Sequence, residues 1–346
     1  MKLKTIATFA LLALIVPLAG CGARNGPPAK AGQLKLGMVT DVGGLGDKSF
    51  NDSAHAGLID AQKRLGAHTQ VLQSHSAADY QPNLSALTNG HLDMIYAIGF
   101  LMNHDVDTVA KQNTGQRYAI VDAVVDEPNV VSVTFKEEDG SFLAGALAAL
   151  VSKSHRVAFL GGQDIPLLRK FEAGFAAGAH QVDPSARVDV KYVNSFDDVA
   201  AGKELANVLF NGGADIIFAA AGKAGLGAID AVKTRPGAFV IGVDSNQDAI
   251  APGKILTSMV KHVDVAVFDV AKAVADKHPM TGHVTLGLAN NAIGLTDFAY
   301  TRNIVGAQNL AKIAQLRAAI IAGKIAPPST REALATFKPV RLTVPR

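Results

Sequence analysis

Three aspartates occupy positions where an α/β protein is expected to bind ligands or do chemistry. Asp41, Asp122 and Asp244 each lie at the end of an apolar, strand-like run. Open α/β sheets bind their ligands beyond the carboxyl ends of the strands. If the three carboxylates converge there, they could form a general acid/base set or accept hydrogen bonds from sugar hydroxyls. Each could instead cap the turn after its strand, and the residues alone leave these alternatives open.

Two phenylalanines and a lysine are expected near the same sheet edges. Phe50 directly follows a polar glycine turn, although its spacing also suits the first core residue of a helix. Phe196 lies in the polar segment SFDD after a strand-like run, and an aromatic side chain there is expected to stack on a ligand. Lys261 follows the apolar run 255–260, where an ordinary exposed lysine is equally compatible with the pattern.

The glycine turn at 43–46 does not match the motifs that bind phosphates. Lys48 is preceded by Asp47 where a P-loop has glycine, and an acid there would repel phosphates. The segment 225–230 begins like a dinucleotide fingerprint but ends in Asp230 where glycine is required. The sequence contains no GxSxG elbow and no HExxH motif. We therefore expect no catalytic residue, no bound metal and no cofactor.

Alternating strands and helices are predicted to position these residues. Strand-like runs alternate with amphipathic or Ala-rich runs along nearly the whole chain, which is typical of doubly wound parallel sheets. In the opening strand–turn–helix unit, Phe50 begins an apolar repeat at helical spacing that Gly66 ends. Ser49 and Asp52 resemble a capping box at the start of this helix. Asp164 is expected to cap the helix that begins at Pro166.

Two series of strand–helix units of similar length predict two lobes. The predicted N-terminal lobe comprises residues 34–134 plus 261–293, and the C-terminal lobe residues 135–260 plus 294–346. The strands are predicted at 34–39, 70–73, 94–100, 118–123, 129–135, 157–160, 188–193, 216–221, 239–243, 255–260 and 293–295. The helices are predicted at 50–65, 83–89, 103–112, 141–151, 166–180, 199–210, 226–233, 263–275 and 307–322.

The N-terminal segment predicts the compartment. Lys2 and Lys4 precede an apolar run at 6–18 that is short for a membrane span, so residues 1–20 are interpreted as a signal peptide. The run ends in LAGC, which resembles a bacterial lipobox and implies lipid attachment to Cys21, the only cysteine. Residues 21–33 are rich in Pro, Gly and polar residues and are expected to tether the fold to the lipid. We therefore predict an extracytoplasmic, lipid-anchored protein.

The overall charge does not indicate a nucleic-acid partner. The 346 residues carry a formal net charge of +3, and 18% of them are charged. There is no block of basic residues and no interleaving of basic with aromatic residues. We therefore expect no nucleic acid among the partners.

Six sequence blocks follow one another along the chain. They are TDVGGLGDKSFNDSAHAGL, VVSVTFKEEDGSFLAGALAAL, FLGGQDIPLLRKFEAGFAAG, GADIIFAAAG, IGVDSNQD and ILTSMVKHVDVAVFD, at 40–58, 130–150, 159–178, 213–222, 241–248 and 255–269. Together they resemble the basic membrane lipoprotein (BMP) family, the substrate-binding lipoproteins of ABC importers that include purine nucleoside receptors of spirochetes. The resemblance implies a type I periplasmic binding protein, with two Rossmann-like lobes joined by three crossings and the ligand between them.

The resemblance also implies which residues would hold the base of a purine nucleoside. Asp41 of TDVGG would hydrogen-bond the base, and Phe50 and Asn51 of KSFN would lie against it. Phe196 of SFDD would stack on the opposite face. A purine offers two π faces, so one ring from each side suits this ligand. His55 departs from the family pattern, in which an aromatic residue is common at this position.

The sugar would be held by a second group of residues. Asp122, Asp244 and Lys261 would take the ribose hydroxyls, and Gly222 of AAAG would line the pocket. Hydroxyls donate charge-assisted hydrogen bonds to carboxylates, whereas a nucleotide phosphate would meet like charge. Lys223 departs from the family pattern, in which a small residue follows AAAG.

We therefore expect a lipid-anchored receptor that captures a purine nucleoside and presents it to an ABC-type permease. Such a protein performs no chemistry. One alternative is an extracytoplasmic enzyme that cleaves nucleosides with the three aspartates. Another keeps the fold but makes the chain a sensor of a sugar-like signal.

Overall fold

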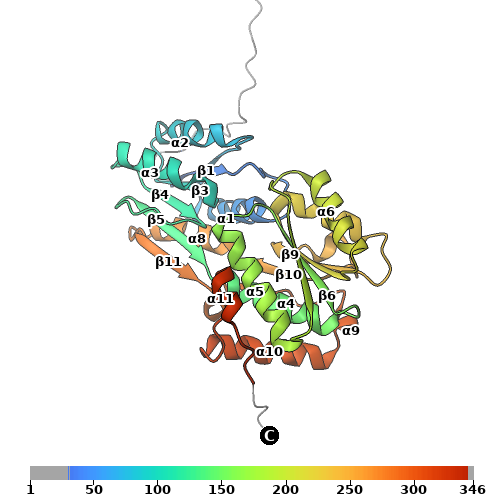
Figure 1. Cartoon of the computed structure of the whole chain (residues 1–346). Coiled ribbons are helices and arrows are strands. Elements are labelled where there is room, and N and C mark those ends of the chain that lie inside the picture. The colour runs from blue at the N-terminus through green and yellow to red at the C-terminus, as the bar shows by residue number, and fades with distance from the viewer. Residues whose placement is uncertain (1–29, 31, 342–346) are drawn as a thin grey trace, which may run out of the picture.

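The chain folds into two α/β halves, each built on a six-stranded sheet (Figure 1). The computed structural model describes residue 30 and residues 32–341. The predicted signal peptide 1–20, Cys21 and most of the tether lie outside the described residues. Within the described residues, no helix has the length and apolar character that crossing a membrane requires.

The first sheet has the strand order β11-β5-β4-β3-β1-β2, and all its strands are parallel. Leu36 and Met38 of β1 pack toward one helix pair, whereas Val39 packs toward the other. Burial on both faces explains the nearly continuous apolar composition of this strand. The strands are β1 Lys35–Thr40, β2 His68–Leu72, β3 Met94–Ile98, β4 Tyr118–Val121, β5 Val130–Phe135 and β11 Gly282–Leu286. The helix pairs are α1 Phe50–Leu65 with α8 Val263–Ala275, and α2 Tyr80–Thr88 with α3 Asn103–Gln112.

The second sheet has the order β12-β10-β9-β8-β6-β7, in which only β12 is antiparallel to its neighbour. Phe159, Phe175 and Phe218 form an aromatic cluster in its core, with ring centroids 5.5–6.3 Å apart. The strands are β6 Arg156–Gly161, β7 Arg187–Tyr192, β8 Ile216–Ala220, β9 Phe239–Asp244, β10 Ile255–Lys261 and β12 Ile293–Leu295. The helix pairs are α4 Glu137–Val151 with α5 Pro166–Val182, and α6 Val199–Asn211 with α7 Gly225–Val232.

Three segments cross between the two sheets: Lys136 between β5 and α4, His262 between β10 and α8, and residues 287–292 between β11 and β12. We propose to define the lobes by the sheets, so that Lys261 and Ile293, which pair with each other, both belong to the second lobe.

The C-terminal helices complete the second lobe (Figure 1). These helices are α9 Arg302–Val305, α10 Ala307–Ile321 and α11 Arg331–Thr336. α10 packs on α4 and α11 packs on α5. Arg331 fixes the last helix, since its guanidinium is 2.6 Å from Glu172 and 3.1 Å from Asp164. The end of the chain is therefore held to α5 by a small ion-pair network.

Helices α4 and α5 approach each other closely because glycines face each other's backbone. A methyl group at Gly145 would overlap the carbonyl oxygen of Phe175, and one at Gly178 would overlap that of Phe142. The contact leaves no room for side chains at these two positions. The close packing holds the N-termini of both helices under the carboxyl edge of the second sheet.

Some local predictions differ from the structure. Strand β11 was not predicted, because its alternating sequence is largely exposed at the edge of the sheet. Ile165, and not Asp164, is the N-cap of α5; Asp164 instead pairs with Arg169.

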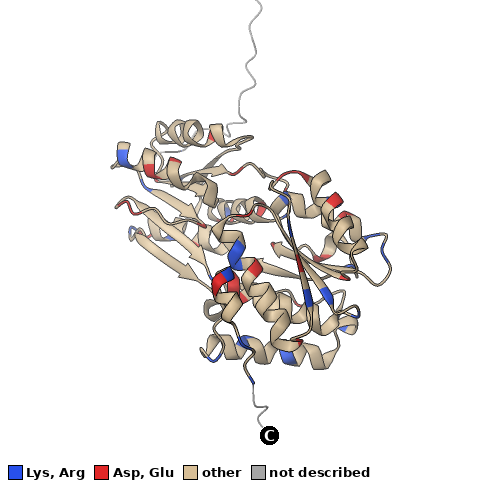
Figure 2. Cartoon of the chain, viewed as in Figure 1, with Lys and Arg blue, Asp and Glu red and all other residues tan. Residues whose placement is uncertain are grey.

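Acidic and basic residues are interspersed over both lobes in the view of Figure 2.

Candidate functional site

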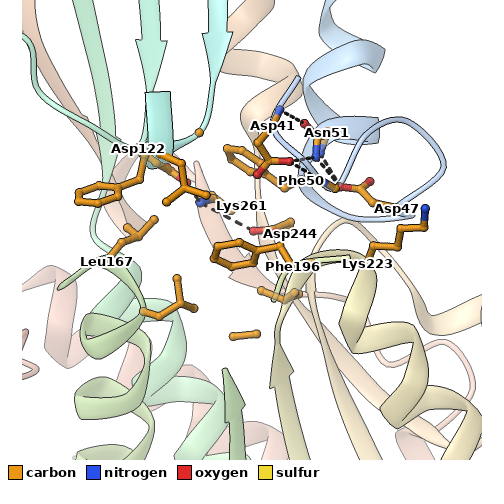
Figure 3. A pocket seen from close by; sticks show the side chains of 18 of the residues that line it. Asp41, Asp47, Phe50, Asn51, Asp122, Leu167, Phe196, Lys223, Asp244 and Lys261 are labelled. Atoms are coloured by element: carbon orange, nitrogen blue, oxygen red, sulfur yellow. Dashed lines mark hydrogen bonds and ion pairs between the residues drawn. The ribbon is translucent and has the colours of Figure 1, made fainter. Parts of the chain in front are cut away.

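One cavity lies between the lobes, at the carboxyl ends of the strands of both sheets. All eight residues singled out from the sequence line it. Figure 3 shows Asp41, Asn51 and Lys223 at one end and Asp122 and Leu167 at the other. The eight residues are Asp41, Phe50, Asn51, Asp122, Phe196, Gly222, Asp244 and Lys261.

Asp41 directly follows β1 and is held by a network of hydrogen bonds in the glycine turn. Its Oδ1 accepts from the Gly43 N–H at 2.8 Å and from Asn51 Nδ2 at 2.7 Å. Its own N–H donates to Asn51 Oδ1 at 3.2 Å. Burial raises the pKa of Asp41 to about 7, although these hydrogen bonds oppose the rise. Its second oxygen, Oδ2, accepts no hydrogen bond from a described residue.

Asp47, and not Ser49, caps helix α1, so the predicted capping box is wrong. The Asp47 carboxylate accepts from the N–H groups of Ser49, Asn51 and Asp52 at 2.8–3.0 Å. Asn51 Nδ2 adds a fourth bond at 3.0 Å. A carboxylate at a helix N-terminus satisfies free N–H groups and suits the helix dipole. The cap therefore fixes Asn51, which in turn fixes Asp41.

Two aromatic rings reach the cavity from opposite lobes (Figure 3). Phe50 opens α1 and is 8% exposed, so it is a core residue whose ring also lines the cavity. Phe196 lies on the loop after β7 and packs over Gly162, where any side chain would overlap its ring. Gly222 also faces Phe196 and has a φ of 56°, which favours glycine. The Phe196 ring therefore excludes a side chain at Gly162, and the backbone conformation of Gly222 disfavours one there.

Lys261 lies at the centre of the site, buried and surrounded by acids. Its Nζ is 2.5 Å from Asp122 Oδ2, 3.8 Å from Asp244 Oδ1 and 4.0 Å from Glu137 Oε1. Burial lowers the pKa of Lys261, but the three carboxylates outweigh this effect and hold it above its usual range. The ring centroid of Phe50 is 4.7 Å from Nζ, within cation–π range. Lys261 therefore stays a cation in the described site.

The aspartates on either side of Lys261 have unusual backbones. Asp122 has φ of 70° and Asp244 has φ of 62°, a left-handed region that non-glycine residues adopt rarely. Such backbone conformations are frequent at ligand sites. Asp122 Oδ1 is buried and has no partner among the described residues. Burial raises the pKa of Asp244 to about 6, although the charge of Lys261 opposes the rise.

The turn before α1 and the loop after β9 join the two lobes directly. Ser49 Oγ donates to Asp244 Oδ2 at 2.8 Å, and Ser245 Oγ donates to the Ser49 carbonyl at 2.8 Å. Gln247 Nε2 donates to the Lys48 carbonyl at 3.0 Å. We call these three bonds the latch. Asp244 therefore takes part both in the cavity and in the contact between lobes.

The family follows from a comparison of the whole chain. A sequence model described as "ABC transporter substrate-binding protein PnrA-like" (Bmp) matches residues 34–331. The chain belongs to this family. The predicted resemblance to the BMP family is confirmed, and as a Bmp protein the chain is an ABC transporter substrate-binding protein.

Relatives of this Bmp protein carry several names. "ABC transporter nucleoside-binding protein BmpA" of Lactococcus lactis subsp. cremoris is 33% identical, over 95% of this chain and 100% of that protein. "CD4+ T-cell-stimulating antigen" of Listeria monocytogenes is 35% identical, over 95% of this chain and 99% of that protein. "Basic membrane protein A" of Borreliella afzelii is 35% identical, over 70% of this chain and 75% of that protein.

Solved structures show the same fold. An ABC transporter solute-binding protein of Aeropyrum pernix K1 superposes with a TM-score of 0.81 at 27% identity, covering 88% of this chain and 96% of that chain. A solute-binding protein of Conexibacter woesei superposes with a TM-score of 0.67 at 20% identity, covering 86% and 99%. The predicted type I periplasmic binding fold with two parallel-sheet lobes is confirmed.

The sequence did not single out every residue of this Bmp site. In the sequence, Asp47 indicates only that the glycine turn is not a P-loop. Its role as the cap of α1 that holds Asn51 was not predicted. Glu137 is fully buried beside Lys261, and only its place at the start of a helix could have indicated it. Leu167 and Phe171 line the cavity from the first turns of α5, where their apolar character looked like ordinary core.

Proposed function

We propose that this Bmp protein captures a purine nucleoside between its lobes and delivers it to an ABC-type permease. The observation that carries the proposal is the cavity itself, in which Phe50 and Phe196 reach a common space from opposite lobes. Asp41 lies at one end of that space, and Asp122 and Lys261 lie toward the other. A flat base with two π faces and a sugar with vicinal hydroxyls suits this arrangement.

The free acceptors support a ligand that donates hydrogen bonds. Asp122 Oδ1 is buried and has no partner in the part of the chain that the structure describes, and a buried carboxylate oxygen without a hydrogen bond is costly. A ribose hydroxyl would satisfy it, and a second hydroxyl would reach Asp244 next to Lys261. We propose that these residues take the sugar, and that Asp41, Phe50, Asn51, Phe196 and Gly222 surround the base.

The alternative of a nucleoside-cleaving enzyme has less support. Asp122 Oδ2 is paired with Lys261, and Asp244 Oδ2 accepts from Ser49, so each carboxylate already has one oxygen engaged by the protein. Among residues 32–341, no group of three or more His, Cys, Asp or Glu side chains could hold a metal ion. A sensor of a sugar-like ligand would use the same carboxylates but would not need the two rings.

The test is a titration of the purified protein with nucleosides, free bases, nucleotides and sugars, followed by melting temperature and product formation. A nucleoside at about 100 times its Kd should add roughly 2.7 kcal/mol of stability, a shift of several degrees. The variant Phe196→Ala should melt like the parent but lose most of this shift. No shift with any purine nucleoside would refute the proposal, and cleavage of one would identify an enzyme.

We further propose that Cys21 carries the lipid that anchors the protein outside the cytoplasm. A membrane anchor would keep the receptor near its permease and so raise their effective concentration. Cells that produce Cys21→Ser should release the protein from the membrane fraction. Equal membrane retention of parent and variant would contradict this assignment.

A further inference from the structure

The base end of the cavity has few polar side-chain groups free for a ligand. Both carboxylate oxygens of Asp47 accept two hydrogen bonds each, all from α1 or its N-cap residue Ser49. Asn51 Nδ2 has two hydrogens, and it donates one to Asp41 and one to Asp47. These two side chains are therefore committed to the protein, and we do not expect Asn51 to donate to the base.

Two polar groups at this end remain uncommitted among the described residues. One is Asp41 Oδ2, since Oδ1 takes both of the hydrogen bonds that reach this carboxyl group. The other is Lys223 Nζ, which makes no hydrogen bond or ion pair with a described residue. Lys223 lines the cavity from the short helix Gly222–Ala224 of the second lobe. Figure 3 shows it at the same end as Asp41 and Asp47.

A free acceptor and a free donor therefore lie at the end of the cavity proposed for the base. An ionised carboxylate accepts only, and an ammonium group donates only. The six-membered ring of a 6-oxopurine presents an N1–H donor next to an O6 acceptor, so it matches both groups. Adenine presents an N1 acceptor next to an N6 amino donor, so it matches neither. The flexible stem of lysine lets its ammonium group follow the position of O6.

We propose that Asp41 and Lys223 together select 6-oxopurine nucleosides, such as inosine and guanosine, over adenosine. Asp41 Oδ2 accepts the N1–H, and Lys223 Nζ donates to O6. This inference rests on the proposed function and names the ligand class of the same site. Asp41 belongs to the first lobe and Lys223 to the second. Only a base that carries an N1–H donor next to an O6 acceptor can therefore hydrogen-bond to both lobes through one edge.

The size of the preference follows from what adenosine leaves unpaired. A site built to hydrogen-bond a ligand rejects an analogue that leaves its buried polar groups without partners. At pH 8, where Asp41 is mostly ionised, we expect adenosine to bind at least about tenfold more weakly than inosine. A second probe, 1-methylinosine, keeps O6 but lacks the N1–H, so it tests Asp41 without any mutation.

The experiment is calorimetric titration of the parent, Lys223→Met and Lys203→Met with inosine, guanosine, adenosine and 1-methylinosine. Lys203 is exposed on α6 and does not line the cavity, so Lys203→Met serves as the matched control. Lys223→Met keeps the length of the side chain but removes the donor. It should weaken the binding of inosine about tenfold and leave the affinity for adenosine nearly unchanged. Lys203→Met should keep the parent's ratio of inosine affinity to adenosine affinity.

The outcomes separate this inference from the proposed function. If the parent binds inosine and adenosine equally, or if Lys223→Met keeps the parent's ratio, the selection by Lys223 is refuted while nucleoside binding stands. If 1-methylinosine binds as tightly as inosine, Asp41 does not accept the N1–H. If no nucleoside binds, the proposed function fails, and this inference fails with it.

Discussion

The carboxyl group of Asp41 illustrates how a residue that we propose to bind the ligand can weaken the fold that holds it. Its pKa rises to about 7 in the folded protein, mainly through burial and also through the charges of Asp47 and Asp122, from an ordinary value of 3.8. Between pH 4 and 7 the folded state therefore holds more protons than the unfolded state. Linkage then requires that stability falls as the pH rises through this range.

Replacing Asp41 by Asn should remove part of this dependence. The Asn side-chain oxygen can still accept from Gly43 and Asn51, but no buried charge forms at high pH. We expect Asp41→Asn to melt a few degrees higher than the parent at pH 8 and to differ little at pH 5. Asp244 shifts in the same direction, so the variant keeps some pH dependence. Melting curves at both pH values test this, and equal shifts at pH 5 and 8 would contradict it.

Individual residues of the site were predictable where sequence position determines their place. An aspartate that follows a buried parallel strand must lie at the carboxyl edge of the sheet, so Asp41, Asp122 and Asp244 were found. The hydrogen bonds around them were not predictable. Ser49 and Asp52 have capping-box spacing, yet the tertiary contact with Asp244 takes the Ser49 hydroxyl and leaves capping to Asp47.

At the scale of elements, the packing of α4 on α5 makes a sharp prediction. Gly145→Ala must push the two helices apart, because its new methyl group would overlap the Phe175 carbonyl oxygen. Overpacking of this kind costs about 1–3 kcal/mol or more of unfolding free energy. Gly115→Ala is the matched control, since nothing lies within 4 Å of its added methyl group. The urea midpoint of Gly145→Ala should be lower than that of Gly115→Ala. Equal midpoints would show that the two helices move apart at little cost in free energy.

The latch connects the turn before α1 to the end of β9 and the loop after it, and it predicts a kinetic effect. Ser49→Ala removes the hydrogen bond to Asp244, and loss of such a bond costs about 1 kcal/mol. We expect the ligand to dissociate about fivefold faster, with little change in melting temperature of the free protein. Ser85→Ala on α2, whose hydroxyl makes no bond to a described residue, serves as the control. Stopped-flow dissociation measures this effect, and identical rates for Ser49→Ala and Ser85→Ala would contradict it.

Most elements could be predicted because their apolar periodicity is set by burial on both faces of each sheet. The exceptions are the short helices α9 and α11 and strand β11, whose residues Gly282–Leu286 are mostly exposed at a sheet edge. Its pairing with β5 depends on a contact about 150 residues away in sequence. Local composition carries no signal for such a pairing, which explains why the strand was missed.

The whole molecule is expected to close around its ligand. The three crossings form a narrow connection, and the latch and the ion pair of Lys261 with Asp122 join the lobes only when they are together. Ligand that contacts both lobes stabilises the closed form by its differential affinity. Small-angle X-ray scattering should show a smaller radius of gyration at saturating nucleoside than without it. Identical scattering profiles with and without ligand would show that closure does not accompany binding.

The sequence indicated two lobes and their crossings, but not how the lobes meet. The alternation of strands and helices predicts the number and the order of the strand–helix units. Contacts such as that of Gln247 with Lys48, in contrast, join loops 199 residues apart. These contacts depend on the relative orientation of two rigid bodies. No local pattern in the chain specifies that orientation.

The position of Lys261 next to one of the crossings implies an order of events. Lys261 is the last residue of β10, directly before the chain passes to the first lobe, and Glu137 lies just beyond another crossing. In a hinged body, points near the axis travel short arcs and points far from it travel long ones. Lys261, which we propose to contact the ribose, should therefore be nearly in place in the open protein, while Phe196 and Lys223 arrive last. A nucleoside would then bind first through its ribose, and its base would contact Phe196 and Lys223 only as the lobes come together.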